Sequence, residues 1–242
     1  MLILLIVVGP AGVFGHGANP KVVALYESTG PMGAVHALTD NQGIFGELNF
    51  SYRWVCEDAI YPLARTQGLA LFGEFNERWV VGTSHGLHSS DDGGCEFTAL
   101  DHEVLGVEQI AGIWQHPTTG TLITTTVILD RPNQVYRSTD EGRTWVALPL
   151  TVSGRLKRVE WIRTQPEVLI LHAESGLYVS APDMDFRVID VSVDGTPIAP
   201  QLLTQIAPSP RHAERILASV RVGERSRILQ TLDGGQTWRD VA

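Results

Sequence analysis

Alternation of apolar and polar residues, with a period of two, is the clearest pattern along the chain. The stretch 216–222 (ILASVRV) alternates in this way, as expected for a strand whose two faces have different neighbours. Two further stretches, 78–82 (RWVVG) and 120–129 (GTLITTTVIL), are rich in the branched and aromatic residues typical of strands. No segment has a convincing amphipathic helical pattern. The pattern therefore predicts an all-β protein of many short strands.

Each of these stretches precedes a copy of one short motif. Residues 138–145 (STDEGRTW) and 231–238 (TLDGGQTW) both fit Ser/Thr-x-Asp-x-Gly-x-Thr-Trp without a mismatch. A third copy at 90–97 (SDDGGCEF) keeps the Ser, Asp and Gly, and two weaker copies lie at 47–54 (ELNFSYRW) and 180–186 (SAPDMDF). The third positions of the five copies are 49, 92, 140, 182 and 233, so the spacings are 43, 48, 42 and 51 residues. That is the length of a four-stranded propeller blade.

The chemistry of the motif is structural. In a tight hairpin an Asp side chain accepts hydrogen bonds from inward-pointing backbone N–H groups, and Gly adopts a conformation that a Cβ would forbid. The aromatic residue at the end of the motif packs against the sheet. The alternative, in which Asp140 and Asp233 are acid/base catalysts, is the weaker one. The residues expected to build these hairpins are Ser90, Asp92, Gly94, Phe97, Ser138, Asp140, Gly142, Trp145, Thr231, Asp233, Gly235 and Trp238.

These motifs resemble the Asp-box, or BNR, repeats of the sialidase-like superfamily. In style they are closest to bacterial exported proteins of the photosystem II stability and assembly factor type and to sortilin-type repeat proteins. The resemblance implies an all-β fold, a β-propeller of four-stranded antiparallel blades with Asp-box hairpins. About five blades are expected, at roughly 20–58, 59–102, 103–150, 151–195 and 196–242, within a propeller domain that spans 20–242. They would form either a closed five-bladed ring or part of a six- or seven-bladed ring.

The N-terminus is an uncharged apolar run, residues 1–15. Its length suits the apolar region of a signal peptide and is too short to span a bilayer comfortably. It lacks a basic region, and His16 makes the cleavage site imperfect. We predict a signal peptide at 1–18, a secreted or periplasmic location, and no stable membrane span once the signal is removed. The alternative is a buried N-terminal strand.

The chain has two cysteines, Cys56 and Cys95, which follow the weak first motif and lie within the second one. Both are expected near the same end of adjacent blades, as a disulfide between blades would require. Export makes such a bond plausible, because disulfides persist in oxidising compartments. We therefore predict a disulfide between Cys56 and Cys95, with two buried thiols as the alternative.

The resemblance implies that the Asp boxes lie at the end of each blade opposite the ligand face. Loops between the second and third strands, and between successive blades, would then form that face. They are polar and lean acidic, which suits a cationic, peptide or hydroxylated partner; the plainer alternative is that loops are polar because water surrounds them. The candidate ligand-face residues are Asp40, Asn41, His85, Asp101, His102, Asp130, Arg131, Glu174, Glu224 and Arg225.

Charge and histidine spacing exclude several classes of partner. The 18 Lys and Arg against 27 Asp and Glu give a net charge of −9, which argues against nucleic acid as a partner. His85 and His88 are three residues apart in what looks like a strand or a turn and are expected to point to opposite faces, so they do not suggest a metal site. Residues 91–94 (DDGG) lack the oxygen-ligand series of a calcium loop. We predict no metal and no cofactor.

Two functions from different classes remain. The preferred one is an exported, non-catalytic propeller that binds a protein, peptide or glycan partner, an assembly or stability factor being one form of this role. The alternative is a glycoside hydrolase of the sialidase-like group, which would need two carboxylates flanking the bond, or a Tyr nucleophile, and for sialic acid an arginine cluster. The Arg-Ile-Pro signature of that group is absent, so an enzyme is the less favoured reading.

Overall fold

A computed structural model describes residues 21–27, 35–39, 43–48, 51–62, 64–163, 167–180 and 185–241. The predicted signal peptide, the candidate residues Asp40 and Asn41, and the central residues of the two weakest motif copies lie outside these ranges.

The described residues form five four-stranded antiparallel sheets that follow one another along the chain. The first sheet contains β1 (Val22–Glu27), β2 (Val35–Thr39), β3 (Ile44–Leu48) and β4 (Ser51–Val55). The second contains β5 (Thr66–Phe72), β6 (Arg78–Thr83), β7 (Gly86–Ser90) and β8 (Thr98–Ala99). The third contains β9 (Ile110–Gln115), β10 (Leu122–Thr126), β11 (Asn133–Ser138) and β12 (Val146–Val152).

The fourth sheet contains β13 (Leu156–Ile162), β14 (Val168–Ala173), β15 (Gly176–Ser180) and β16 (Phe186–Ile189). The fifth contains β19 (Leu203–Ser209), β20 (His212–Val222), β21 (Arg225–Thr231) and β22 (Arg239–Asp240). Three short elements lie between the sheets. They are helix α1 (Glu57–Ile60), the two-stranded hairpin of β17 (Ser192–Val193) and β18 (Thr196–Pro197), and the 3-10 turn η1 (Pro200–Leu202).

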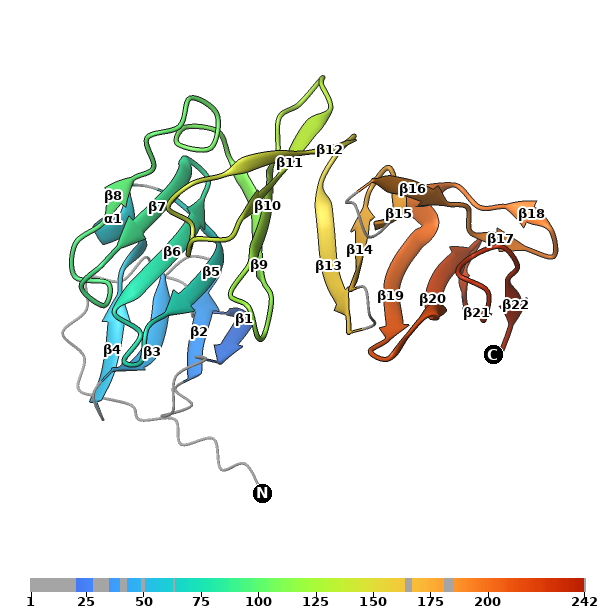
Figure 1. The fold of residues 1–242 in the computed structure, drawn as a ribbon, viewed down its shortest axis with the longest axis horizontal. Coiled ribbons are helices and arrows are strands. Elements are labelled where there is room, and N and C mark those ends of the chain that lie inside the picture. The colour runs from blue at the N-terminus through green and yellow to red at the C-terminus, as the bar shows by residue number, and fades with distance from the viewer. Residues whose placement is uncertain are drawn as a thin grey trace.

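The five sheets are arranged in an arc, with the first strand of each sheet on the inside (Figure 1). Strand order in every sheet follows chain order, so each chain segment runs outward from the centre before it returns to begin the next sheet. The first and fifth sheets lie at the two ends of the arc (Figure 1). Of the two arrangements expected from the sequence, the described sheets form part of a ring and not a closed five-bladed one.

A β-bulge recurs at the same place in all five sheets, where the inner strand pairs with the second strand. The register shifts between Val22 and Ala24, Thr66 and Gly68, Thr125 and Thr126, Leu156 and Arg158, and Leu203 and Gln205. A bulge bends a strand and increases its local twist. Its repetition gives each inner strand the same shape and makes positions in the five sheets directly comparable.

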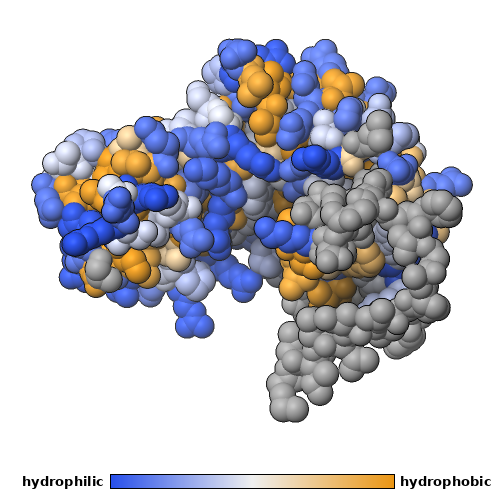
Figure 2. Space-filling model, turned by 180° about the vertical axis from the view of Figure 1, so that it is seen from behind, coloured by the Kyte–Doolittle hydropathy of each residue, from blue (hydrophilic) through white to orange (hydrophobic). Residues whose placement is uncertain are grey.

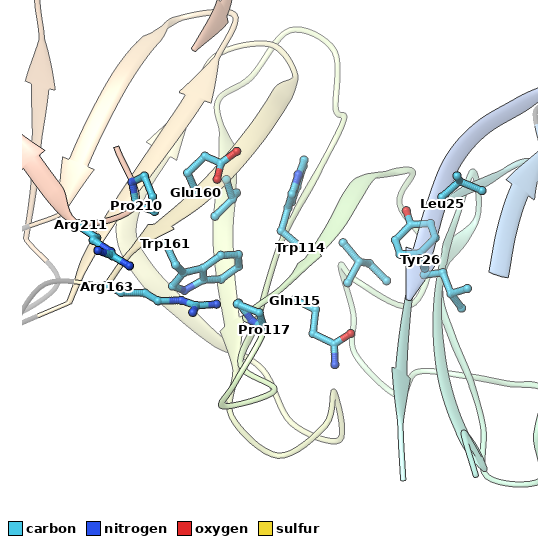
Figure 3. A pocket seen from close by; sticks show the side chains of 13 residues that line it. Leu25, Tyr26, Trp114, Gln115, Pro117, Glu160, Trp161, Arg163, Pro210 and Arg211 are labelled. Carbon is cyan, nitrogen blue, oxygen red and sulfur yellow. The ribbon is translucent and has the colours of Figure 1, made fainter. Parts of the chain in front are cut away.

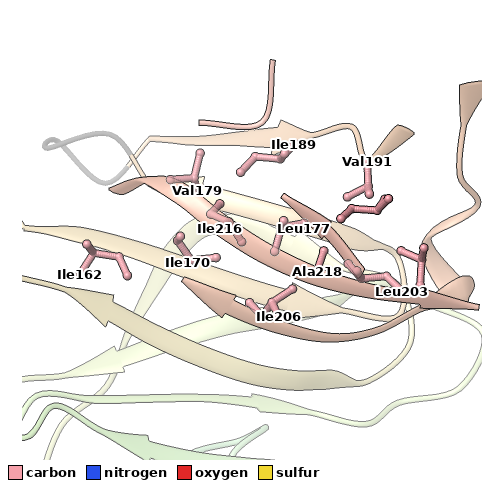
Figure 4. Close-up of a cluster of buried hydrophobic side chains, with 12 residues drawn as sticks. Ile162, Ile170, Leu177, Val179, Ile189, Val191, Leu203, Ile206, Ile216 and Ala218 are labelled. Carbon is pink, nitrogen blue, oxygen red and sulfur yellow. The ribbon is translucent and has the colours of Figure 1, made fainter. Parts of the chain in front are cut away.

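The core consists of four clusters of apolar side chains among the described residues, and each cluster lies between two consecutive sheets. Between the fourth and fifth sheets, for example, Ile170 and Leu177 pack with Ile206, Ile216 and Ala218 (Figure 4). No such cluster among the described residues joins the first sheet to the fifth. Stability therefore depends on the face-to-face contact between neighbouring sheets.

The motif at 138–145 forms a closed network of hydrogen bonds in the hairpin after β11. The hydroxyl of Ser138 donates to Asp140 Oδ1 (2.8 Å) and accepts from the N–H of Gly142 (2.9 Å). Asp140 also accepts from the backbone N–H of Thr144 (2.9 Å) and from its hydroxyl (2.6 Å). Both oxygens of the Asp140 carboxylate therefore accept hydrogen bonds from within the turn, as the structural interpretation of the motif requires.

The other two strong motif copies repeat this network. Thr231 donates to Asp233 Oδ1 (2.7 Å), and Asp233 accepts from the N–H of Thr237 (2.9 Å). In the second sheet, Ser90 donates to Asp92 Oδ1 (2.6 Å), which also accepts from the N–H of Cys95 (2.9 Å). The same residue types at the same spacing thus build the same turn three times.

The hairpins also contact the preceding sheet. Gly142 has a φ of 76°, and a Cβ on it would lie 2.9 Å from Val80 of the second sheet. The guanidinium of Arg78 donates to the carbonyl of Glu141 (2.9 Å), and Arg187 donates in the same way to Gly234 (3.1 Å). Each strong hairpin is therefore fixed both within its own sheet and against its neighbour.

The predicted disulfide between Cys56 and Cys95 is not formed. Cys95 lies in a hairpin at one end of the second sheet, where its Sγ is 3.0 Å from the guanidinium of Arg53. Cys56 follows Val55, which pairs with Ile44 at the opposite end of the first sheet. A strand rises about 3.3 Å per residue, so Cys56 lies roughly 10 Å beyond Arg53 along β4, away from the hairpin end of the first sheet. The prediction was wrong because it placed both cysteines at the same end.

Thiol labelling checks this arrangement. Cys95 is exposed and Cys56 is partly buried, so we expect a thiol reagent to modify Cys95 in the native protein without prior reduction, faster than Cys56. Cys95→Ser should leave the unfolding midpoint unchanged, because no cross-link is lost. Labelling that begins only after a reductant is added would contradict the structure.

Acid unfolding checks the hairpin networks. Burial raises the pKa of Asp140, but hydrogen bonds from Thr144 and Ser138 outweigh it and lower the pKa to about 2. Hydrogen bonds from the Thr237 hydroxyl and N–H lower the pKa of Asp233 to about 2. Because both values lie below the ordinary 3.8, this stabilisation is complete above about pH 4 and is lost as the pH falls toward 2.

We therefore expect the free energy of unfolding, measured by denaturant titration, to fall steeply between about pH 4 and pH 2. Asp140→Asn combined with Asp233→Asn should be less stable at neutral pH and should show a flatter acid limb. Asp130→Asn, a loop control, should keep the wild-type pH dependence. A double variant with an unchanged acid limb would show that the hairpin carboxylates do not carry the effect.

Candidate functional site

The inner strands surround a central cavity of about 1320 Å³. It is lined from the first sheet by Leu25 and Tyr26 and, across the centre, by Pro210 and Arg211 at the turn between β19 and β20. Figure 3 shows the lining side chains, and Figure 2 shows the hollow between the two halves of the molecule from behind. All five sheets contribute at least one residue to the wall.

Two tryptophans on neighbouring inner strands form the aromatic part of the wall. Trp114 lies on β9 and Trp161 on β13, and both are partly buried against the cluster between the third and fourth sheets. Figure 3 shows both indoles on the cavity side. Because neither is fully buried, each leaves part of its aromatic surface facing the cavity.

A buried histidine holds Trp161 in place. The ring of His116 meets the indole edge-to-face, with centroids 5.5 Å apart. His116 Nδ1 accepts from the N–H groups of Thr118 (3.1 Å) and Thr119 (2.9 Å), so the proton lies on Nε2, which is 2.7 Å from Glu167 Oε1. This bridge links the end of β9 to the start of β14 and fixes the position of the aromatic wall.

A second cavity, of about 440 Å³, lies at the entry end of the inner strands and shares Tyr26, Ile113 and Trp114 with the first. Arg155 forms part of its wall, and its guanidinium donates to Gln67 Oε1 (2.8 Å) and to the carbonyl of Ala111 (3.0 Å). One side chain thereby connects the inner edges of the second, third and fourth sheets. The two cavities together follow the inner strands from one end to the other.

Polar groups in the large cavity are unevenly distributed. The carboxylate of Glu160 forms an ion pair with Arg158. The cationic side chains that line the wall are Arg163 and Arg211. Both guanidiniums are exposed, and Figure 3 shows them close together beside Glu160 and Trp161. Among the described residues, no ion pair involves either of them. This side of the cavity therefore presents positive charge next to aromatic surface.

Tyr26 is the aromatic group on the opposite wall. Burial raises the pKa of its phenol, and this outweighs the opposing effect of a hydrogen bond with the Leu69 backbone. The hydroxyl therefore stays protonated at neutral pH and is able to donate or accept a hydrogen bond.

Of the candidate ligand-face residues that the structure describes, Glu174 alone lines one of these cavities, the smaller one. Its Oε2 accepts from the N–H of Arg155 (3.0 Å), so it also closes the local turn. His102 is used in a turn as well, because its Nδ1 accepts from the N–H groups of Val104 and Leu105 (3.2 Å each). The structure does not bring the remaining described candidates into either cavity; these are His85, Asp101, Asp130, Arg131, Glu224 and Arg225.

The prediction that His85 and His88 point to opposite faces is wrong. The ring of Tyr61 is stacked on His85, at 4.9 Å between centroids, and also contacts His88, at 5.3 Å. His85 lies in the turn before β7 and not within the strand, so strand alternation does not apply to it. In the described parts of the chain, no group of three or more His, Cys, Asp or Glu side chains is placed to hold a metal ion.

The candidate residues predicted from the sequence lie in loops, so Gln67, Trp114 and Trp161 were not among them. These three lie on the inner strands β5, β9 and β13. A usable signal was present, since the first strands of two consecutive repeats each carry a tryptophan.

Searches of protein-family models and of curated proteins find no match to this chain. Solved structures do resemble it. One is an ancestral GH74 enzyme, 18% identical, covering 95% of this chain and 32% of its own, with a TM-score of 0.71. Another is the GH74 xyloglucanase from Xanthomonas campestris, 16% identical, covering 86% and 36%, with a TM-score of 0.54. A third is the extracellular domain of a hybrid two-component system from B. thetaiotaomicron, 14% identical, covering 91% and 28%, with a TM-score of 0.59.

The chain is a β-propeller. At these identities the likeness shows the fold alone, and the chain spans about a third of the length of the structures it resembles. Each four-stranded sheet of the propeller is a blade. Within the described parts of the chain, no helix is long and apolar enough to cross a membrane.

The role of Arg155 as a connector of the inner strands is testable. Arg155→Lys should lower the free energy of unfolding by about 1 kcal/mol, because a lysine cannot reproduce the guanidinium bonds to Gln67 and Ala111. Arg163→Lys is the matched control and should leave stability unchanged. Denaturant titration of both variants measures the difference, and equal stability of the two would show that Arg155 is not a connector.

Proposed function

We propose that the chain is a non-catalytic binding propeller that holds a segment of a protein, peptide or glycan partner in its central cavity. The observation that supports this most directly is the wall formed by Trp114 and Trp161 with Arg163 and Arg211 beside them. Binding cavities are lined mainly by apolar and aromatic groups, with a few polar groups that set orientation. This wall has that composition.

The chemistry of the wall favours a partner segment that carries an acidic group. Indole surface takes a flat ring or an aliphatic stem, and guanidinium groups recognise carboxylates or phosphates. The acidic lean of the surface loops had suggested a cationic partner. The charge inside the cavity points the other way, because its acidic Glu160 is already paired with Arg158.

The alternative of a glycoside hydrolase receives less support from these cavities. Such an enzyme needs two carboxyl groups about 5 to 10 Å apart, or a tyrosine nucleophile with its base. Among the described lining residues, each of the two central cavities contains one carboxylate: Glu160 in the large cavity and Glu174 in the small one. Both already serve in local contacts. The two arginines of the large cavity also fall short of a three-arginine cluster.

The setting we propose for this function is outside the cytoplasm, in the secreted or periplasmic space. The apolar run of residues 1–15 supports export. Such a protein could assemble or stabilise its partner, because a cavity that binds a segment without reacting with it stabilises the bound conformation.

Tryptophan fluorescence tests the proposal, because Trp114 and Trp161 lie in the cavity wall. We expect an oligogalacturonate or an oligoglutamate peptide to shift the emission, and a neutral cello-oligosaccharide to do so much less. Binding should weaken with added salt, since exposed charges are screened. Trp161→Leu should reduce affinity about tenfold, equivalent to about 1.4 kcal/mol, and Arg163→Gln combined with Arg211→Gln should remove the salt dependence.

Trp54→Leu is the matched control, since Trp54 lies on the first blade outside the cavity, and it should bind as wild type does. Equal weakening by Trp54→Leu and Trp161→Leu would contradict a site in the cavity, as would the absence of any response to either acidic probe. Turnover of an aryl glycoside panel that is abolished by Glu160→Gln would show that the protein is an enzyme.

A further inference from the structure

The inner strand of each blade has one edge that no strand of its own blade pairs with. It pairs with the second strand along its other edge, and the free edge faces the centre of the arc. Backbone N–H and C=O groups along a free edge need partners, and an uncovered edge is a template for another strand. The edge of β13 is of particular interest, because this strand has a described blade on each side.

Val159 and Trp161 direct their backbone groups to the free edge of β13. The N–H of Leu169 on β14 donates to Ser180 Oγ (2.8 Å), so the backbone groups of Leu169 face β15 and not β13. Leu169 and Trp161 therefore form a non-hydrogen-bonded pair, in which the backbone groups of both residues point away from each other. The N–H and C=O of Trp161 thus face the centre, as do those of Val159 two residues earlier.

The corresponding edges of the second and third blades are covered. On β5, the side-chain amide of Gln115 accepts from the N–H of Leu71 (3.4 Å) and donates to its C=O (3.1 Å), as a neighbouring strand would. On β9, Gly68 of the second blade lies so close that a Cβ on it would be 2.4 Å from the backbone nitrogen of Ile113. Side-chain and backbone contacts between consecutive blades therefore close these two edges.

Trp114 prevents the third blade from covering β13 in the same way. Gly112 follows the bulge of β9 as Gly68 follows that of β5. Gly68 packs on the Ile113 backbone, but the nearest group to a Cβ on Gly112 would be the indole of Trp114, at 3.0 Å. The indole takes the place of a close contact between strands and keeps the β9 backbone away from the edge of β13.

The open edge borders the large cavity. Val159 and Trp161 both line it. The side chain of Val159 is buried in the cluster between the third and fourth blades, so the part of this residue that faces the cavity is its backbone. In the described parts of the chain, no hydrogen bond reaches the edge groups of either residue.

The edge closes at Arg163, and positive charge lies beside the closure. The N–H of Arg163, which comes next in the same alternation, donates to the carbonyl of Pro210 (3.2 Å). The guanidiniums of Arg163 and Arg211 lie close together in the wall at this end (Figure 3). A strand added to β13 would therefore meet two cationic groups where the free edge ends.

We propose that the partner segment is an extended peptide that adds as a strand to the free edge of β13, with an acidic side chain at Arg163 and Arg211. The inference rests on the proposed function and narrows its partner to a polypeptide. A glycan chain has no backbone of alternating N–H and C=O groups that could pair with a strand. In such additions the main-chain hydrogen bonds provide affinity, and contacts with alternate side chains provide specificity.

N-methylated peptides test the backbone pairing. The probe is an acetylated and amidated heptapeptide that alternates Val and Glu, with one isomer N-methylated at every Val and another at every Glu. Alternate N–H groups of an extended peptide point to opposite edges, so one isomer loses the donors that face β13 and the other keeps them. In titrations followed by tryptophan fluorescence, we expect one isomer to bind about tenfold more weakly than the parent peptide and the other to match it.

Each isomer is the matched control of the other, because both carry the same modification on the same sequence. Equal affinity of both isomers, whether retained or lost, would overturn the strand addition. Binding of the parent peptide that still depends on Trp161 would leave the proposed function standing in that case. A parent peptide that does not bind at all would overturn both the strand addition and the proposed function.

Amide hydrogen exchange, followed residue by residue by NMR, tests the edge without changing the protein. In the free chain, the amide of Trp161 should exchange faster than that of Glu160, whose N–H points to β14. The parent peptide should slow exchange at Val159 and Trp161 and leave Leu129, on an exposed loop outside the cavity, unchanged. A Trp161 amide that is already protected in the free chain, or one that the bound peptide does not protect, would overturn the proposal.

Discussion

The face-to-face packing of consecutive sheets is the interaction on which the rest of the structure depends. A four-stranded sheet cannot enclose a core by itself, and here every apolar cluster draws its side chains from two neighbouring sheets. The hairpin glycines serve the same contact: a Cβ on Gly142 would lie against Val80, and one on Gly235 would lie 2.2 Å from Ile189. The hairpin of each short motif therefore packs against the preceding sheet and helps to set the distance between the two sheets. This explains why the motif repeats together with the sheet.

The central cavity is a consequence of that packing. Because each blade directs its first strand inward, side chains from strands far apart in the sequence converge on one axis (Figure 1). Polar side chains then connect these strands, as when Gln115 exchanges hydrogen bonds with the backbone of Leu71 across the gap between β9 and β5. The wall thus combines fixed polar connectors with partly exposed indoles, and the guanidinium groups of Arg163 and Arg211 give it a local charge opposite to that of the chain as a whole.

The errors made from the sequence share one origin. Assigning Cys56 and Cys95 to the same end of adjacent blades required knowledge of where β4 ends relative to the hairpin of the second sheet, and three residues of strand are enough to separate them. Similarly, the relative direction of His85 and His88 depended on whether His85 lay in a strand or in a turn. In both cases the residue types were right for the chemistry, but position along a strand decided the contact.

The sequence by itself determined the repeating unit. The alternating pattern is set by the period of a strand, and the Ser/Thr-x-Asp-x-Gly spacing is set by hydrogen bonds within a single turn, so both are local and readable from a few neighbouring residues. Only the tertiary structure decided which side chains share the centre and which blade faces stay uncovered. Trp114 and Trp161 are 47 positions apart, and Leu25 is exposed whereas Leu69, at the equivalent position of the second sheet, is buried. Those properties depend on how whole sheets are placed against one another, which no local pattern of residues encodes.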